Sequence, residues 1–302
     1  MNEYERHVPV LLQQTIRYLN VRRGGTYVDA TLGLAGHSSA IARELGPQGK
    51  LIAFDRDPEA MVLARQQLDA LRNELGAAMP EVILHDVEFS QAGERLQPAS
   101  LDGLLADFGA SSMHFDDAHR GFSFQADGPL DMRMNPRQGA TAEQVVNQAG
   151  EKELADLIYE FGEERRSRRI ARAIVRARPI TTTAQLARIV AAAAPAMKHK
   201  GARHFLHPAT RTFQALRIYV NAELEEIGAL LKAAPGLLKP GGRLVVISFH
   251  SLEDRLAKDA LRQGAQQGAY EVLTRKPATA DAEETDRNPR SRSAKLRAAE
   301  RK

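Results

Sequence analysis

The sequence lacks the features that mark secreted and membrane-bound proteins. It contains no cysteine among its 302 residues, which excludes disulfide bonds, catalytic thiolates and cysteine-ligated zinc. No apolar run approaches the roughly twenty residues that a membrane-spanning helix requires, and the polar start lacks the apolar core of a signal peptide. These absences predict a cytoplasmic protein without a membrane partner.

Charge is nearly balanced in number but uneven along the chain. The 42 lysines and arginines exceed the 38 acidic residues by only four. Between Arg165 and Arg178, however, seven arginines occur without an acid, and the segment from Arg287 to Lys302 is again basic. Such runs suit a phosphate backbone, although a solvated helix face would show the same pattern.

The stretch from Thr26 to Ile41 reads as a short buried strand, a loop of small residues, and a helix that begins near Gly36. Small residues at such a turn let a ligand approach the backbone, and the free N–H groups of the helix start attract anionic groups. The next predicted strand, from Lys50, ends on Asp55. A carboxylate there can accept hydrogen bonds from both hydroxyls of a ribose. Together these features predict a nucleoside-cofactor site.

The glycine spacing bears on which cofactor binds. A nicotinamide site would read Gly-x-Gly-x-x-Gly, whereas this loop has Gly33-x-x-Gly36 with no glycine two residues before Gly33. An acid followed by small residues at alternate positions fits the loop of methyltransferases better, in the order Asp29, Thr31, Gly33 and Ala35. The pattern favours a methyl donor over NAD, and a strand-turn-helix without a ligand is the remaining alternative.

Further strands are predicted at 81–86, 101–109 and 243–249, with helices between them, one of which spans 58–75. Alternating strands and helices predict a parallel sheet whose ligands bind beyond the carboxyl ends of the strands. Four acids stand at such ends: Asp29, Asp55, Asp86 and Asp107. A last edge strand is predicted at 270–274, followed from Ala278 by a flexible polar loop and a short basic helix.

The strand pattern is interrupted between 115 and 209, where the periodicity indicates helices separated by Gly and Pro. A long amphipathic helix is then predicted over 209–231. The fold class is therefore α/β, a doubly wound sheet formed by 1–114 and 210–302, with a helical domain inserted at 115–209. Phe122 and Phe124, near the start of the insertion, are assigned to its core in preference to base stacking.

Taken together, a set of short motifs from His7 to Arg301 resembles the bacterial RsmH (MraW) methyltransferases, which methylate N4 of a cytidine in the decoding region of the small-subunit (16S) ribosomal RNA. Besides the Asp29 to Ser38 loop and Asp55-Arg56-Asp57-Pro58, the matching motifs are Gly121-Phe122-Ser123-Phe124, Gly128-Pro129-Leu130-Asp131-Met132-Arg133-Met134, Gly162-Glu163-Glu164-Arg165, His207-Pro208-Ala209-Thr210-Arg211-Thr212-Phe213-Gln214, Ser248-Phe249-His250-Ser251-Leu252-Glu253-Asp254-Arg255 and Asn288-Pro289-Arg290. The resemblance covers nearly the whole chain.

The resemblance implies a class I S-adenosylmethionine (SAM) fold whose inserted helical domain recognises the 16S rRNA. By matching position, it implies cofactor contacts at Ala35, Gly36, His37, Asp55, Phe89, Asp107 and His114. Two of these depart from the family's pattern. Ala35 replaces a usual Gly, which the backbone contact tolerates if φ stays negative, and His114 replaces a usual Gln while keeping a hydrogen-bond donor and acceptor.

Asp107 is the candidate catalytic residue, because it would accept a hydrogen bond from the cytosine N4–H and turn the nitrogen lone pair toward the methyl group. Arg165, Arg168, Arg203 and Arg211 are the candidate phosphate contacts. His199, His204 and His207 lie in a Lys/Arg-rich segment without a neighbouring acid, so no metal site is predicted. His250 and Glu253 are assigned to a helix start as readily as to acid–base chemistry.

Two other functions remain open on the sequence. A non-catalytic RNA-binding assembly factor could keep the same fold, and a nicotinamide-dependent oxidoreductase could use the same sheet, although the glycine spacing opposes it. The sequence does not fix the oligomeric state, and a homodimer is left open. It also does not say whether free rRNA or the assembled subunit is the substrate.

Overall fold

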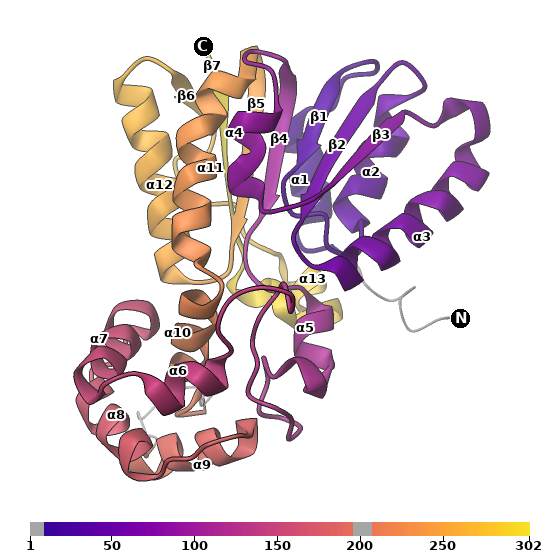
Figure 1. Ribbon diagram of the computed structural model, residues 1–302. Helices are drawn as coiled ribbons and strands as arrows, with labels where there is room; N and C mark the ends of the chain where they lie inside the picture. Colours follow the sequence, from indigo (N-terminus) through magenta and orange to yellow (C-terminus); the bar gives the residue numbers. More distant parts are fainter. Residues whose placement is uncertain (1–8, 196–206) are drawn as a thin grey trace. The chain divides into compact units, whose positions relative to one another are not determined.

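The computed structural model describes residues 9–195 and 207–302. These residues form an α/β unit, Met1–Gly109 with Leu224–Lys302, and a helical unit, Ala110–Glu223 (Figure 1). The helical unit extends beyond the predicted 115–209 at both ends. The division into a cofactor domain and a substrate domain stays a prediction.

The α/β unit is built on a seven-stranded sheet in the order β3-β2-β1-β4-β5-β7-β6. The strands β1 to β5 pair in parallel, whereas β7 runs antiparallel to both of its neighbours. The sheet confirms the predicted doubly wound α/β class. The strands are β1 (Thr26–Asp29), β2 (Lys50–Asp55), β3 (Glu81–Asp86), β4 (Leu101–Asp107), β5 (Leu238–Ser248), β6 (Tyr270–Val272) and β7 (Lys295–Arg301).

Helices cover both faces of the sheet, which explains the continuous apolar runs of its central strands. One face packs against α1 (Leu12–Leu19), α2 (Gly36–Leu45) and α3 (Pro58–Leu75) through a core that includes Leu19, Ile41 and Leu68. The other face packs against α4 (Ala92–Arg95), α11 (Glu223–Leu237) and α12 (Ser251–Gln266). Helix α3 has the predicted bounds, with Pro58 in its first turn and the Asp57 side chain as its N-cap.

The C-terminal end corrects one prediction. The expected flexible loop and basic helix are instead α13 (Ala282–Arg287), the 3-10 turn η5 (Pro289–Ser293) and strand β7. The alanines of β7 favour a helix on local propensity, but the strand lies between β5 and β6 and is buried on both faces, with Ala298 and Ala299 fully enclosed. Tertiary pairing therefore overrides local preference. Strand β6 is an edge strand as predicted, but it is not the last strand in the chain.

The predicted long helix over 209–231 is also wrong, because two helices, α10 (Thr210–Val220) and α11, replace it. Between them Ala222 adopts φ of 48°, and Asn221 leaves the helical pattern. The Asn221 amide donates to the carbonyl of Met132 at 2.7 Å, and its oxygen accepts from the Met134 N–H at 2.7 Å. The break therefore places a buried amide where it binds the 128–134 loop within the helical unit.

The helical unit has a core of its own, formed by residues such as Leu154, Ile158, Ile170 and Leu186. The helix that begins at Thr183 is capped by Thr182, whose hydroxyl accepts a hydrogen bond from Gln185 N. Besides α10, its helices are α5 (Ser112–Asp116), α6 (Ala142–Gln148), α7 (Glu151–Gly162), α8 (Ser167–Arg176) and α9 (Thr183–Ala193). Short 3-10 turns complete the two units: η2 (Gly76–Ala78), η3 (Phe89–Gln91) and η4 (Ala118–Arg120).

In the part of the chain that the structure describes, no helix is both long and apolar enough to cross a bilayer.

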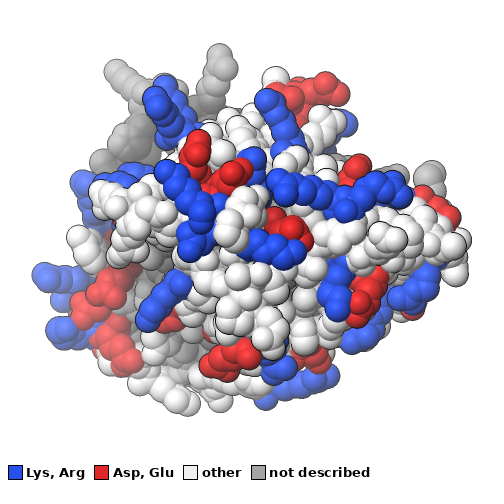
Figure 2. Space-filling view, turned by 90° about the horizontal axis from the view of Figure 1, so that it is seen from above, with Lys and Arg blue, Asp and Glu red and all other residues white. Residues whose placement is uncertain are grey.

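The face drawn in Figure 2 carries basic and acidic side chains interspersed with one another, not gathered into a patch of one sign. Exposed ion pairs of the α/β unit, such as Lys50–Glu81 at 3.0 Å, contribute little to stability because water screens them.

One hydrogen bond joins the two ends of the α/β unit. The N–H of Leu11, directly before α1, donates to Glu284 Oε1 of α13 at 2.5 Å. Leu11 is fully buried and has φ of 55°, so its N–H cannot reach solvent. The carboxylate therefore acts as an N-terminal cap that is supplied by a residue 273 positions further along the chain.

We expect Glu284→Ala to lower the free energy of unfolding by about 1–2 kcal/mol, because it leaves a buried N–H without an acceptor. Glu284→Gln keeps an acceptor oxygen and should recover most of that loss. Urea denaturation of the three proteins measures the effect. Equal stability of Glu284→Ala and the wild type would show that the cap is not needed.

Candidate cofactor and active site

The loop after β1 is held by a buried carboxylate. Asp29 is 1% exposed; its Oδ1 accepts from Thr31 N at 3.1 Å, and its Oδ2 accepts from the Ser38 hydroxyl at 2.7 Å. Burial raises the pKa of Asp29 to about 7, against these two hydrogen bonds, which lower it, and the Asp55 charge adds to the rise. Asp29 thus fixes the start of α2 to the end of β1.

The sheet register places two further acids two residues beyond the level of Asp29, in the direction of the carboxyl ends of the strands. Asp29 lies opposite Ala53 and Leu105, so Asp55 and Asp107, each two residues later on its strand, are nearer the carboxyl edge. Asp55 is oriented by backbone donors: its Oδ2 accepts from Gly33 N at 2.8 Å and its Oδ1 from Asp57 N at 2.9 Å. Both oxygens of Asp55 are thereby held in place near the carboxyl edge of the sheet.

Asp107 has its two oxygens in different surroundings. Its Oδ2 lies 3.6 Å from His37 Nδ1, whereas its Oδ1 is buried and has no hydrogen-bond partner among the described residues. Burial raises the pKa of Asp107 well above its ordinary value, and the carboxylates of Asp29 and Glu253 raise it further. The backbone of Asp107 is fixed by Thr31 Oγ1, which accepts from its N–H at 2.7 Å.

His37, in the first turn of α2, is buried with 7% of its surface exposed. Its Nε2 lies 3.0 Å from the carbonyl of Val10. Just before Val10, Pro9 lies so close to Gly36 that a Cβ at position 36 would overlap the proline ring. The segment before α1 therefore packs directly on the start of α2, and glycine is required at position 36.

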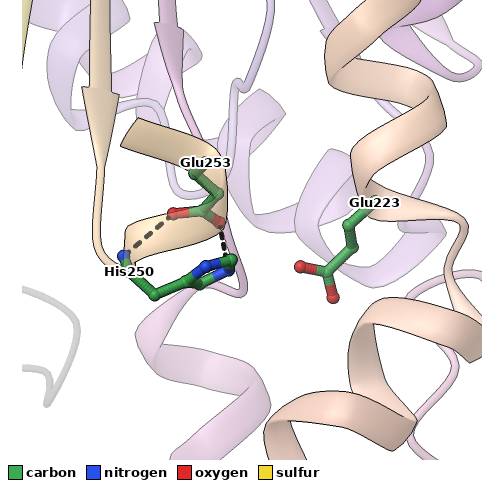
Figure 3. A group of neighbouring side chains, drawn as sticks. All are labelled: Glu223, His250 and Glu253. Carbon is green, nitrogen blue, oxygen red and sulfur yellow. Dashed lines mark hydrogen bonds and ion pairs between the residues drawn. The ribbon is translucent and has the colours of Figure 1, made fainter. Parts of the chain in front are cut away.

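Glu253 contributes charge from the start of α12. It is fully buried, its Oε2 accepts from the N–H groups of Phe249 and His250 at 2.7 and 3.3 Å, and its Oε1 lies 3.0 Å from His250 Nε2. Figure 3 shows the His250 ring turned toward this carboxylate. The arrangement is a capping box, which confirms the helix-start assignment. Glu223, also drawn there, is bound within the helical unit by Arg217 through two contacts of 2.9 Å.

Phe89, the predicted aromatic contact, lies in η3 after β3. It is partly buried against the core, and its ring centroid is 6.3 Å from that of Phe108. Asp86, at the end of β3, is opposite Asp55 in the register and is exposed. The α/β unit therefore brings Ala35, Gly36, His37, Asp55, Phe89 and Asp107 to the carboxyl edge of its sheet.

The remaining predicted site residues lie in the helical unit. Phe122 is 4% exposed, and Phe124 packs against Phe213 with ring centroids 4.8 Å apart, so both belong to the core as predicted. Arg165 and Arg168 are exposed. Arg211 Nη1 donates to the Glu163 carbonyl at 2.9 Å, which gives this arginine a structural contact. Arg203, His199 and His204 lie outside the described residues.

Comparison with known proteins bears on this arrangement. The model of the MraW methylase family matches residues 4–302. The chain belongs to the MraW methylase family. It is 80% identical over 300 residues to ribosomal RNA small subunit methyltransferase H of Acidobacterium capsulatum, covering 99% of this chain and 100% of the relative, and 61% identical over 296 residues to that of Koribacter versatilis, covering 98% and 94%. Among solved structures, TrmN from Thermus thermophilus has a TM-score of 0.44 at 15% identity, covering 97% of this chain and 48% of that one.

The resemblance implies a Gly where Ala35 stands, and the structure corrects the expectation that φ of Ala35 stays negative. Its φ is 61°, not negative, because the tight turn pairs Ala35 N with the Leu32 carbonyl at 2.8 Å. A left-handed alanine costs about 1–2 kcal/mol. Its methyl group is fully buried, and that packing offsets part of the cost.

The resemblance implies a Gln where His114 stands, and the structure shows which contacts the histidine makes there. It is the third residue of α5, and its Nδ1 accepts from Ser111 N at 3.0 Å, which is the contact that a Gln side chain makes in a capping box. The ring also stacks on Phe122 at 4.7 Å. The substitution thus preserves the cap.

The raised pKa of Asp29 predicts how the stability of the protein changes with pH. An unfolded Asp titrates near 3.9, so between about pH 4 and pH 7 the folded protein keeps a proton that the unfolded chain has lost. Its contribution therefore falls as pH rises through this window, by at most about 1.4 kcal/mol per pH unit. We expect Asp29→Asn to gain stability relative to the wild type as pH rises from 4 to 7. Denaturation at a series of pH values measures this, and parallel curves would contradict it.

Proposed function

We propose that this protein is a SAM-dependent methyltransferase that methylates the N4 amine of a cytidine in the decoding region of 16S rRNA. Membership of the MraW methylase family and relatives named ribosomal RNA small subunit methyltransferase H support the proposal. The small-subunit rRNA is the partner that these names imply. A homodimer and a cytoplasmic location stay predictions.

The observation that carries the proposal is the buried Asp107 Oδ1, which has no donor among residues 9–195 and 207–302 and lies near two other carboxylates, Asp29 and Glu253. Like charges in a poorly hydrated site favour a ligand that is positively charged or donates hydrogen bonds. SAM fits this demand, because it supplies its methyl group from a positively charged sulfur. The pyrophosphate of a nicotinamide dinucleotide would add negative charge here, so the site opposes that alternative.

The residues present suit the other parts of SAM. The Asp55 carboxylate, fixed by two backbone N–H groups, would accept from the ribose hydroxyls. The first turn of α2 at Gly36 has N–H groups without a partner inside the helix and would bind the methionine carboxylate. Phe89 would lie against the adenine. Ala35, His37 and His114 are the further contacts that the family's pattern implies.

The proposed methyl transfer is shaped by the weak nucleophilicity of the cytosine N4 amine. The N4 lone pair of cytosine is delocalised into the ring, so it must be turned toward the methyl group. Asp107 Oδ1 would accept a hydrogen bond from N4–H, and the same carboxylate would then take the proton that the methylated nitrogen sheds. Such a nitrogen is acidic, so a weak base held in place is sufficient.

Recognition of the RNA is assigned to the helical unit. A base must be unstacked before its N4 can be reached. Exposed arginines of α8 and of the turn before it, Arg165 and Arg168 among them, would contact phosphates around the target. In this proposal the helical unit holds the strand and the α/β unit carries the reaction.

Transfer of labelled methyl from SAM to small-subunit particles that lack the modification, followed by nucleoside mass analysis, tests the proposal. N4-methylated cytidine is the expected product. SAM binding without transfer to either particles or free rRNA would favour a non-catalytic assembly factor. NAD binding in place of SAM would overturn the cofactor assignment.

We expect Asp107→Ala to lower kcat at least tenfold, because it removes the acceptor for N4–H. Asp107→Asn keeps the shape but cannot take the proton, and should be similarly slow. Calorimetry with SAM separates lost cofactor binding from lost chemistry. A near-normal rate in both variants would remove Asp107 from the mechanism.

We expect the double variant Arg165→Glu/Arg168→Glu to bind rRNA at least tenfold more weakly at low salt, with SAM affinity unchanged, because charge reversal repels the backbone. Arg65→Glu/Lys232→Glu is the matched control. It makes the same change of net charge at exposed residues of α3 and α11. An equal loss of RNA binding in the control would mean that total charge, not this surface, sets the affinity.

A further inference from the structure

We propose that His37 is a positioning residue for Asp107, its Nε2–H anchored on the Val10 carbonyl and its Nδ1 facing Asp107 Oδ2. The inference rests on the proposed function, in which Asp107 receives the proton from N4. The pattern of the MraW family places His37 among the cofactor contacts. The geometry assigns its side chain to the catalytic carboxylate and leaves only its backbone for the cofactor.

The anchor sets which nitrogen carries the hydrogen. A backbone carbonyl can only accept, so His37 Nε2, 3.0 Å from the Val10 oxygen, must donate. In the neutral ring Nδ1 then carries a lone pair. This is the nitrogen that lies 3.6 Å from Asp107 Oδ2. Burial of the ring, at 7% exposure, limits its freedom to turn away.

The Val10 anchor is itself held in place. On one side Pro9 packs against Gly36, and on the other Leu11 N–H donates to Glu284 at 2.5 Å. The carbonyl that orients His37 thus lies between two fixed neighbours. The His37 ring therefore lies between the Val10 carbonyl and the Asp107 carboxylate, and the fold sets the tautomer of this ring.

The separation of 3.6 Å has a physical reason. An ionised carboxylate and an imidazole lone pair repel each other, so Oδ2 and Nδ1 stay beyond hydrogen-bond distance. A proton on Oδ2 changes repulsion into an O–H···N hydrogen bond. The other groups facing Asp107, the carboxylates of Asp29 and Glu253, also favour its protonated form. The raised pKa of Asp107 agrees with this arrangement.

The proton balance is simple. After methyl transfer, an N4–H bond breaks and its electron pair returns to nitrogen as a lone pair, while an O–H bond forms on Asp107. The cationic amine and the carboxylate thus become a neutral methylamine and a neutral carboxylic acid. The proton arrives on Oδ1, and rotation of the carboxylic acid about its Cβ–Cγ bond then turns the O–H toward His37 Nδ1. This nitrogen accepts a hydrogen bond from the acid, and so stabilises the state in which the proton has been received.

Nuclear magnetic resonance of the protein without cofactor tests the pair apart from activity. In ¹⁵N-histidine-labelled protein, His37 is expected as the Nε2–H tautomer. Asp107→Asn should shift its Nδ1 resonance, because the amide brings a donor to that nitrogen. Asp69→Asn, at an exposed position of α3, is the matched control and should leave it unchanged. An Nδ1–H tautomer, or no response to Asp107→Asn, would overturn the proposal.

Kinetics of His37→Gln test whether the imidazole acceptor affects kcat and its dependence on pH. The Gln amide can still donate to the Val10 carbonyl, but no acceptor faces Oδ2. We expect kcat to fall roughly tenfold while the Kd for SAM changes less than threefold. Because the acceptor that stabilises protonated Asp107 is lost, the limb in which kcat rises with pH should move to lower pH. His119→Gln, at an exposed position of η4, is the control.

The outcomes separate the two proposals. His37→Gln with wild-type kcat and an unmoved pH limb would reduce His37 to a structural residue. Inactive wild-type protein would instead refute the proposed function, and a fully active Asp107→Asn would remove Asp107 from the mechanism. In either case the resonance of His37 would still decide whether the pair exists. A fall in melting temperature that parallels the fall in kcat would also count against the inference.

Discussion

The site depends on carboxylates that the fold forces into poorly hydrated surroundings at the ends of β1 and β4. Asp29 lies two residues deeper in the sheet than Asp107. Its carboxylate fixes the loop after β1 to α2 by accepting hydrogen bonds from Thr31 and Ser38. Asp107 lies two residues nearer the edge, and one of its oxygens has no donor within the part of the chain that the structure describes. Neither charge is cancelled by a nearby cation of fixed charge in these contacts, so both groups hold their protons more tightly than an exposed acid does.

Much of this could be predicted from the sequence, because the signals are local. Strands that end on an acid, a loop of small residues and a proline at a helix start each have a direct physical meaning, and β1 to β4 and α3 follow from them. The motifs of the MraW family added the cofactor and the target. No local pattern predicts how deep in the sheet an acid lies. Asp29 and Asp107 differ in this depth, and the difference follows only from the strand register.

The parts that could not be predicted depend on distant partners. Strand β7 is alanine-rich and favours a helix until β5 and β6 pair with it. The break at Asn221 follows from backbone groups of the 128–134 loop that need a buried amide. The positive φ of Ala35 is imposed by a turn that glycine usually fills. In each case a long-range or steric demand outweighs local propensity.

Two of these long-range contacts meet at one place. Glu284 caps Leu11, and the neighbouring carbonyl of Val10 accepts from His37, so the C-terminal segment holds the residue directly after the one that orients the imidazole. A residue far from Asp107 in the sequence is therefore linked to it through two hydrogen bonds and the 3.6 Å contact between His37 Nδ1 and Asp107 Oδ2. Ionisation of Asp29 lowers stability as the pH rises toward about 7. The hydrogen bonds that its carboxylate accepts from Thr31 and Ser38 offset part of that cost, because they favour the charged form.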